Sequence, residues 1–147
     1  MFGGTFDPPH VGHLVAAIDA RQALELDVVL LVVANAPWQK IGSRQVSPAA
    51  DRLAMVRAAV ADAPGLEVSD IEIARGGLSY TADTLEALRG QEPGAELFLV
   101  LGNDAAAGFA SWERHEEVAR PVHHHEPGQP GHLLVVVDRP GTPTPID

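Results

Sequence analysis

The chain has 147 residues, of which 46% are hydrophobic and 20% are charged, and its formal net charge is −10. This balance is typical of a folded globular protein rather than a disordered one, and the length predicts a single domain over residues 1–147. The acidic charge argues against a general nucleic-acid binder, whose affinity depends on clustered Lys and Arg. The absence of cysteine excludes disulfide bonds.

The sequence also indicates where the protein works. Its longest unbroken apolar run, Val28 to Ala34, is too short to cross a bilayer. The first residues lack the basic stretch and apolar core of a secretion signal. We therefore expect a cytoplasmic protein with no membrane partner.

Strand and helix patterns alternate along the chain. The run Val28–Val33 is apolar and rich in β-branched residues, which is typical of a strand buried on both faces of a parallel sheet. Ser47 and Pro48 read as the cap and the first residue of a helix that stops before Pro64. The other predicted strands are 1–4, 66–73, 96–101 and 133–137, and the other predicted helices are 11–26, 81–88 and 104–119.

This alternation predicts an α/β fold with a Rossmann-like open parallel sheet and helices on both of its faces. In such sheets, ligands bind beyond the carboxyl ends of the strands. Two further segments have no predicted helix or strand. They are a polar loop at 121–131, which contains His123–His125, and an extended tail at 141–147.

The most informative segment follows the first predicted strand and reads Gly-Gly-Thr-Phe-Asp-Pro-Pro-His-Val-Gly-His over residues 3–13. Two glycines let the backbone approach a bulky anion, because neither has a Cβ atom. His10 and His13 are three residues apart at the predicted start of a helix, so both imidazoles share one face. Helix N–H groups and the positive end of the helix dipole point the same way. The pattern predicts a site for reacting phosphates.

Each fragment of this motif has an ordinary structural explanation. A Gly-Gly pair is often only a turn, and His-x-x-His can be a surface pair or half of a zinc site. Zinc needs three or four ligands, and no cysteine is present to supply the others. His123–His125 could also bind a metal, although one solvated loop rarely arranges three ligands properly.

The complete motif, Gly-Gly-Thr-Phe-Asp-Pro-x-His-x-Gly-His, resembles the signature of the nucleotidyltransferase α/β superfamily. Further segments resemble the bacterial nicotinate-nucleotide adenylyltransferase family, and the resemblance extends from Gly3 to Gly141. The most discriminating of them is Arg-Gly-Gly-x-Ser-Tyr-Thr-x-Asp-Thr-Leu at 75–85. The form Trp-Gln-Lys at 38–40 resembles the actinobacterial branch of this family.

The resemblance implies transfer of an adenylyl group from ATP, with Mg²⁺, to nicotinate mononucleotide in NAD biosynthesis. It implies that His10 and His13 stabilise charge as pyrophosphate leaves. ATP would be held by Gly3, Gly4, Thr5, Phe6, Lys40 and Asp104. The pyridine ring would be held by Tyr80, Thr81 and Trp112.

Local sequence alone leaves other interpretations open for these positions. Trp112 could be a core residue of an amphipathic helix, Thr81 and Asp104 could be helix caps, and Lys40 could be an ordinary solvated side chain. The resemblance does not decide between nicotinate and nicotinamide mononucleotide, and it leaves the oligomeric state open, a homo-oligomer included.

The sequence departs from the family at three places. Only Met1 and Phe2 precede the glycine pair, the segment 121–131 differs, and no Ser-Ser-Thr-x-x-Arg occurs in 141–147. We therefore expect a fold that is incomplete at both ends, and weak or no activity from these 147 residues alone. Two alternatives follow: a non-catalytic nucleotide-binding remnant, or an adenylyltransferase for another phosphate acceptor.

Overall fold

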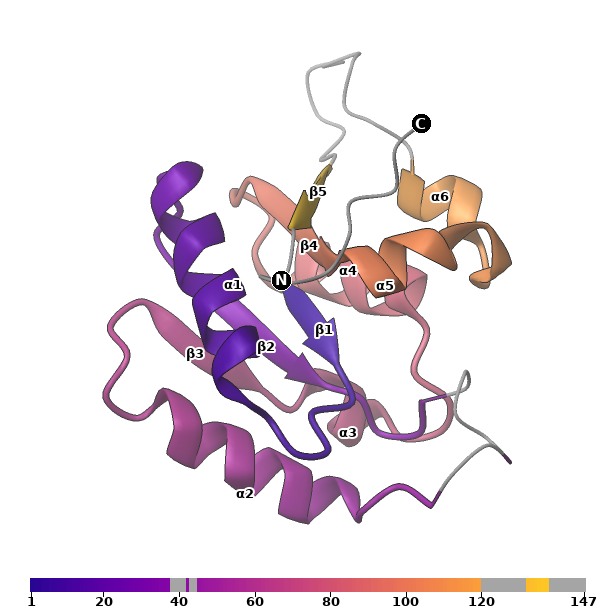
Figure 1. Ribbon diagram of the computed structural model, residues 1–147. Coiled ribbons are helices and arrows are strands. Elements are labelled where there is room, and N and C mark those ends of the chain that lie inside the picture. The colour runs from indigo at the N-terminus through magenta and orange to yellow at the C-terminus, as the bar shows by residue number, and fades with distance from the viewer. Residues whose placement is uncertain (38–41, 43–44, 120–131, 138–147) are drawn as a thin grey trace. The chain divides into compact units, whose positions relative to one another are not determined.

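The computed structural model describes residues 1–37, 42, 45–119 and 132–137 (Figure 1). The chain divides into two compact units, Met1–Ser79 and Tyr80–Asp147. Each unit alternates strands with helices, and every strand pair described within a unit is parallel. The predicted parallel α/β class is confirmed, whereas the prediction of a single domain stays a prediction.

In the first unit, the residues that the structure describes form a three-stranded parallel sheet with its connecting helices (Figure 1). Strand β2 lies between the other two strands, and both connections along the chain are βα crossovers. Helix α2 packs against β2 and β3, and α1 packs against β2. The elements are β1 (Phe2–Gly4), α1 (Val11–Ala23), β2 (Val29–Val33), α2 (Ala49–Val60), β3 (Leu66–Ser69) and α3 (Ile71–Arg75).

The described residues of the second unit form one parallel strand pair and four short helical segments. Strands β4 and β5 pair along their whole length, from Leu97 opposite His132 to Gly102 opposite Val137. Helix α4 packs against α6. The elements are α4 (Thr81–Gln91), β4 (Leu97–Gly102), α5 (Asn103–Ala107), the 3-10 helix η2 (Phe109–Ser111), α6 (His115–Ala119) and β5 (His132–Val137).

Burial follows the predicted apolar pattern in the first unit. Strand β2 is buried at four of its five positions, and Leu31, Val32 and Val33 are fully inaccessible. This is the burial expected of a strand covered on both faces. None of the helices in the described part of the chain is long and apolar enough to cross a membrane.

Several predicted boundaries were wrong for identifiable reasons. The first helix ends at Ala23 rather than Leu26, because Glu25 takes a left-handed conformation with φ of 52°. The predicted strand 66–73 stops at Ser69, where the side-chain oxygen accepts the Ile71 N–H at 3.3 Å and helix α3 begins. Local side-chain bonding of this kind competes with the strand ladder.

The predicted helix 104–119 is broken into α5, η2 and α6. Gly108 separates the first two pieces, and Arg114, with φ of 53°, precedes the third. Gly108 has φ of −94° and ψ of 7°, away from α-helical values, and the positive φ of Arg114 cannot continue a right-handed helix. Trp112 consequently lies just after the 3-10 helix rather than within a long amphipathic helix.

The predicted helix caps also differ. Pro48 rather than Ser47 is the N-cap of α2, and Ser47 is held by other bonds: its N–H donates to Asp7 and its carbonyl accepts from Arg52. Tyr80 rather than Thr81 is the N-cap of α4, and Gly102 rather than Asp104 is the N-cap of α5. At none of these helices does the cap side chain make a capping hydrogen bond.

Candidate active site

The glycine-rich loop, defined here as residues 3–10, begins at the carboxyl end of β1, beside the carboxyl end of β2. The Gly4 carbonyl accepts the Ala34 N–H at 3.0 Å, which continues the pairing one residue past β2. Phe6 is only 2% exposed although its φ is 51°. A Cβ atom on Gly4 would lie 3.0 to 3.2 Å from the Phe6 ring. The loop therefore folds around an inserted phenylalanine, for which Gly4 leaves room.

The two histidines lie together at the start of α1. His10 is the N-cap, and its backbone N–H donates to Nδ1 of His13 at 3.1 Å. The imidazole rings stack with centroids 3.7 Å apart, so the predicted shared face is confirmed. The Phe6 ring meets the His13 ring edge-on at 4.9 Å.

The hydrogen bond from His10 determines which nitrogen of His13 can donate. Because Nδ1 accepts this hydrogen bond, it carries no hydrogen of its own, and the hydrogen of the neutral ring lies on Nε2. His13 can therefore donate through Nε2 at the end of the helix that attracts anions. A Cβ atom on Gly12 would come within 3.0 Å of the His10 ring, so this glycine leaves room for the stacked pair.

Arg52 lies beneath this loop, and the sequence analysis gave it no role. Its side chain is 1% exposed and donates to four main-chain carbonyls. Nε donates to Ser47, Nη2 to Asn35, and Nη1 to Thr5 and Ala34, at distances between 2.6 and 2.9 Å. The sequence does contain one indication that Arg52 is buried. It lies four residues before Val56, so the two side chains share the buried face of α2.

Asp7, in the loop 3–10, also binds the segment before α2. Its carboxylate accepts the Ser47 N–H at 2.8 Å. Burial lowers the pKa of Arg52, and the negative charge of Asp7 opposes that shift. A buried charge is tolerated when hydrogen bonds and an opposite charge compensate for its burial. The guanidinium has four hydrogen bonds to carbonyl oxygens and is attracted by the charge of Asp7.

The end of β2 is tied to a second loop within the same unit. The Asn35 N–H donates to the Ser79 hydroxyl at 2.8 Å, and its side-chain amide donates to the Gly77 carbonyl at 2.9 Å. The Ser79 N–H donates to the Ala36 carbonyl at 3.1 Å. The segment that leads into Tyr80 is thus attached to the strand end that Arg52 holds.

The second unit carries the residues that resemblance assigned to the pyridine ring. Tyr80 and Thr81 lie at the N-terminus of α4, and Trp112 follows η2 with its indole 5.2 Å from the Phe109 ring. The indole Nε1 is inaccessible and has no hydrogen-bond partner in the described part of the chain. Asp104 is exposed in the first turn of α5.

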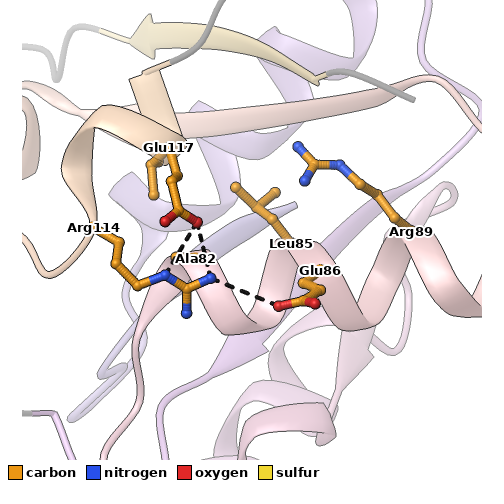
Figure 2. Close-up of a pocket in the computed structure, with 7 residues that line it drawn as sticks. Ala82, Leu85, Glu86, Arg89, Arg114 and Glu117 are labelled. Carbon is orange, nitrogen blue, oxygen red and sulfur yellow. Dashed lines mark hydrogen bonds and ion pairs between the residues drawn. The ribbon is translucent and has the colours of Figure 1, made fainter. Parts of the chain in front are cut away.

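An ion-pair cluster connects the segment after Trp112 to the first turn of α4. Arg114 pairs with Asp83. It also pairs with Glu117 and lies 3.7 Å from Glu86 (Figure 2). These bonds raise the pKa of Arg114, with the hydrogen bond to Glu117 as the largest cause. A pocket of about 270 Å³ lies here, lined by Ala82, Leu85, Glu86, Arg89, Arg114, Glu117 and Val118.

Lys40, the loop 121–131 with His123–His125, and the tail 141–147 lie outside the described residues. In the part of the chain that the structure describes, no three His, Asp or Glu side chains gather in a way that could hold a metal ion. The structure does bring Gly3, Gly4, Thr5, Phe6, His10 and His13 together at one end of β1 and α1.

A glycine-rich loop with two histidines at a helix N-terminus, beyond the carboxyl end of a parallel strand, is an arrangement typical of phosphate-binding α/β proteins. The sequence pattern of the cytidylyltransferase-like family matches residues 1–127. The chain belongs to this family.

Comparison with individual proteins shows which members of this family the chain is similar to. The chain is 45% identical over 134 residues to a probable nicotinate-nucleotide adenylyltransferase of Frankia alni, covering 91% of this chain and 70% of the relative. It is 46% identical over 132 residues to a protein of the same name from Streptomyces coelicolor, covering 90% and 70%. A crystal structure from Vibrio parahaemolyticus, assigned as a nicotinate-nucleotide adenylyltransferase, superposes with a TM-score of 0.71 at 24% identity, covering 94% of this chain and 71% of that one. That superposition supports the nucleotidyltransferase-type Rossmann-like fold.

Proposed function

We propose that this chain transfers the adenylyl group of ATP to nicotinate mononucleotide, giving deamido-NAD and pyrophosphate. The observation that carries the proposal is the identity of about 45% to nicotinate-nucleotide adenylyltransferases over about nine-tenths of the chain. The loop 3–10 and its histidine pair supply the chemistry that such a transfer needs. This reading accounts for the phosphate-binding geometry and requires no nucleophile from the protein.

The proposed reaction is one in-line displacement. An oxygen of the mononucleotide phosphate attacks the α-phosphorus of ATP, and the bond from that phosphorus to the β-phosphate oxygen breaks, so that pyrophosphate leaves. Catalysis of this kind depends on positioning and on stabilising developing negative charge. ATP enters as its Mg²⁺ complex, in which phosphates and water supply most of the metal ligands.

Each site residue has a proposed role in that step. The backbone of Gly3, Gly4, Thr5 and Phe6 lines the nucleotide phosphates. His10 and His13 donate to the departing pyrophosphate, and the arrangement that supports this role is the Nε2 hydrogen of His13 at the start of α1. Lys40 adds a cation to the phosphates, and Asp104 binds ribose hydroxyls.

The proposed pyridine subsite consists of Tyr80, Thr81 and Trp112. The cluster of Arg114 with Asp83 supports their grouping, because it ties the segment after Trp112 to the helix turn that begins at Thr81. The buried Trp112 Nε1 is a donor without a partner in the described residues, and buried indole N–H groups usually have one.

The direct test is exchange of labelled pyrophosphate into ATP by the 147-residue chain. We expect weak exchange from these 147 residues when nicotinate mononucleotide is present, and none without it. A parallel reaction with nicotinamide mononucleotide measures the pyridine preference. ATP binding without exchange would favour a non-catalytic nucleotide-binding protein, and exchange that depends only on a different phosphate acceptor would replace the proposed substrate.

Trp112→Ala tests the pyridine subsite. We expect weaker binding of nicotinate mononucleotide by about 0.5–1.5 kcal/mol, the typical contribution of aromatic stacking beyond buried area, with ATP binding nearly unchanged. Calorimetric titration with each ligand measures both. The matched control is Val118→Ala, which removes a buried side chain of the same unit and should lower the melting temperature without this selectivity. Equal weakening of both ligands by Trp112→Ala would show that the tryptophan is a core residue.

A further inference from the structure

Arg52 connects three segments that are distant in the sequence. Its guanidinium donates to Thr5 in the loop 3–10, to Ala34 and Asn35 just past β2, and to Ser47 before α2. The proposed reaction uses the first of these segments. The other two form the strand end and helix start on which that loop rests, through the Ala34 N–H and the Asp7 carboxylate.

The chemistry of these contacts requires an arginine. A guanidinium is planar, has five N–H donors in fixed directions and has no acceptor. Four hydrogen bonds to four carbonyls therefore fix the mutual placement of the three segments. The ammonium group of a lysine has three donors on one atom, so it cannot span the same carbonyls from one position.

The side chain is placed to act through other groups rather than on a ligand. It is 1% exposed, and the four acceptors of its hydrogen bonds are main-chain oxygens of the protein. We infer that Arg52 is a positioning residue, which holds the loop 3–10, the end of β2 and the start of α2 in the arrangement that binds phosphates. The expected effect on turnover rests on the proposed function. The anchoring of the three segments does not, because it is a property of the fold.

Arg52→Lys tests the inference in the 147-residue chain by amide hydrogen exchange. We expect about tenfold faster exchange at the amides of Thr5, Phe6 and Ala34, because loss of an anchor lowers the free energy of local opening. The matched control is Val56→Ala, which removes a fully buried apolar side chain one turn further along the same face of α2. That control should lower the unfolding midpoint and leave the exchange of these three amides less affected. Unchanged exchange in Arg52→Lys, or equal acceleration in both variants, would overturn the inference.

The kinetic arm compares the same two variants at a temperature where circular dichroism shows both to be folded. We expect Arg52→Lys to lower kcat about tenfold or more, since a misplacement of about 1 Å can cost roughly a hundredfold in rate, and to raise the KM for ATP. Val56→Ala should keep both parameters near those of the unchanged chain. Equal kinetics for the two variants would contradict a positioning role. Absence of turnover in the unchanged chain would count against the proposed function. The amide hydrogen-exchange experiment would still test whether Arg52 anchors the loop 3–10.

Asp7→Asn provides a second variant if Arg52→Lys does not fold. It removes the negative charge that raises the pKa of Arg52, and it keeps an oxygen that can accept the Ser47 N–H. We expect a smaller acceleration of exchange at the same amides, with strand β3 unchanged. No acceleration at Thr5 and Ala34 would overturn the inference.

Discussion

Replacing His13 with alanine is expected to lower turnover by a factor on the order of hundreds, equivalent to about 3–4 kcal/mol of transition-state stabilisation. The reason is the loss of a positioned donor, because the hydrogen bond from the His10 backbone leaves the proton of the neutral His13 ring on Nε2. Steady-state kinetics with ATP and nicotinate mononucleotide measures the effect. The KM for the mononucleotide should change far less than kcat, since the donor acts on the departing pyrophosphate.

Val11→Ala is the matched control for that experiment. Val11 lies in the same helical turn, but its side chain is 75% exposed, so the variant should retain normal turnover. Thermal melting of His13→Ala should show only a small loss, because the released His10 N–H is in an exposed position. Near-normal turnover of His13→Ala would remove this histidine from the mechanism.

Leu31→Ala is expected to lower the free energy of unfolding by about 2–5 kcal/mol, the usual range for a buried leucine truncated to alanine. Leu31 is completely inaccessible and lies in the middle of β2, opposite Phe2 on one neighbouring strand and Val68 on the other. Urea denaturation followed by circular dichroism measures the change.

Val28→Ala serves as its control. Val28 directly precedes β2 and is 38% exposed, so the same kind of truncation should cost much less. A loss from Leu31→Ala no larger than that from Val28→Ala would mean that the central strand does not hold the first unit together. Such a result would also count against β2 as the support that positions Ala34 and Asn35.

Much of the fold follows from the sequence because burial follows apolar pattern. The run Val28–Val33 predicted a doubly buried strand, and β2 occupies nearly the same residues. Boundaries were less predictable where one residue leaves the regular backbone. Arg114 carries no sequence signal for a positive φ, yet it separates α6 from η2. Ile71 and Ile73 alternate as in a strand, but they form a helix after Ser69 accepts the Ile71 N–H.

The histidine pair was predictable from spacing alone, since residues three apart at a helix start must share a face. The Arg52 anchor was not. Its four partners are carbonyl groups, which every residue type possesses, so no side chain at the other positions indicates the contact. The link from Asn35 to the Ser79 hydroxyl was not predictable either, because the two residues are 44 positions apart in the sequence. The roles of Tyr80, Thr81, Trp112, Asp104 and Lys40 stay predictions.

The use of main-chain acceptors also bears on how this protein can change during evolution. Thr5 and Ser47 can be replaced without deleting the oxygens that Arg52 binds, because those oxygens belong to the backbone. Mutational tolerance is therefore unevenly distributed, with one position constrained by the anchor and its partner positions left freer to vary. Loops held in this way can acquire new side chains, and with them new ligand contacts, while a single arginine keeps the loop backbone in place.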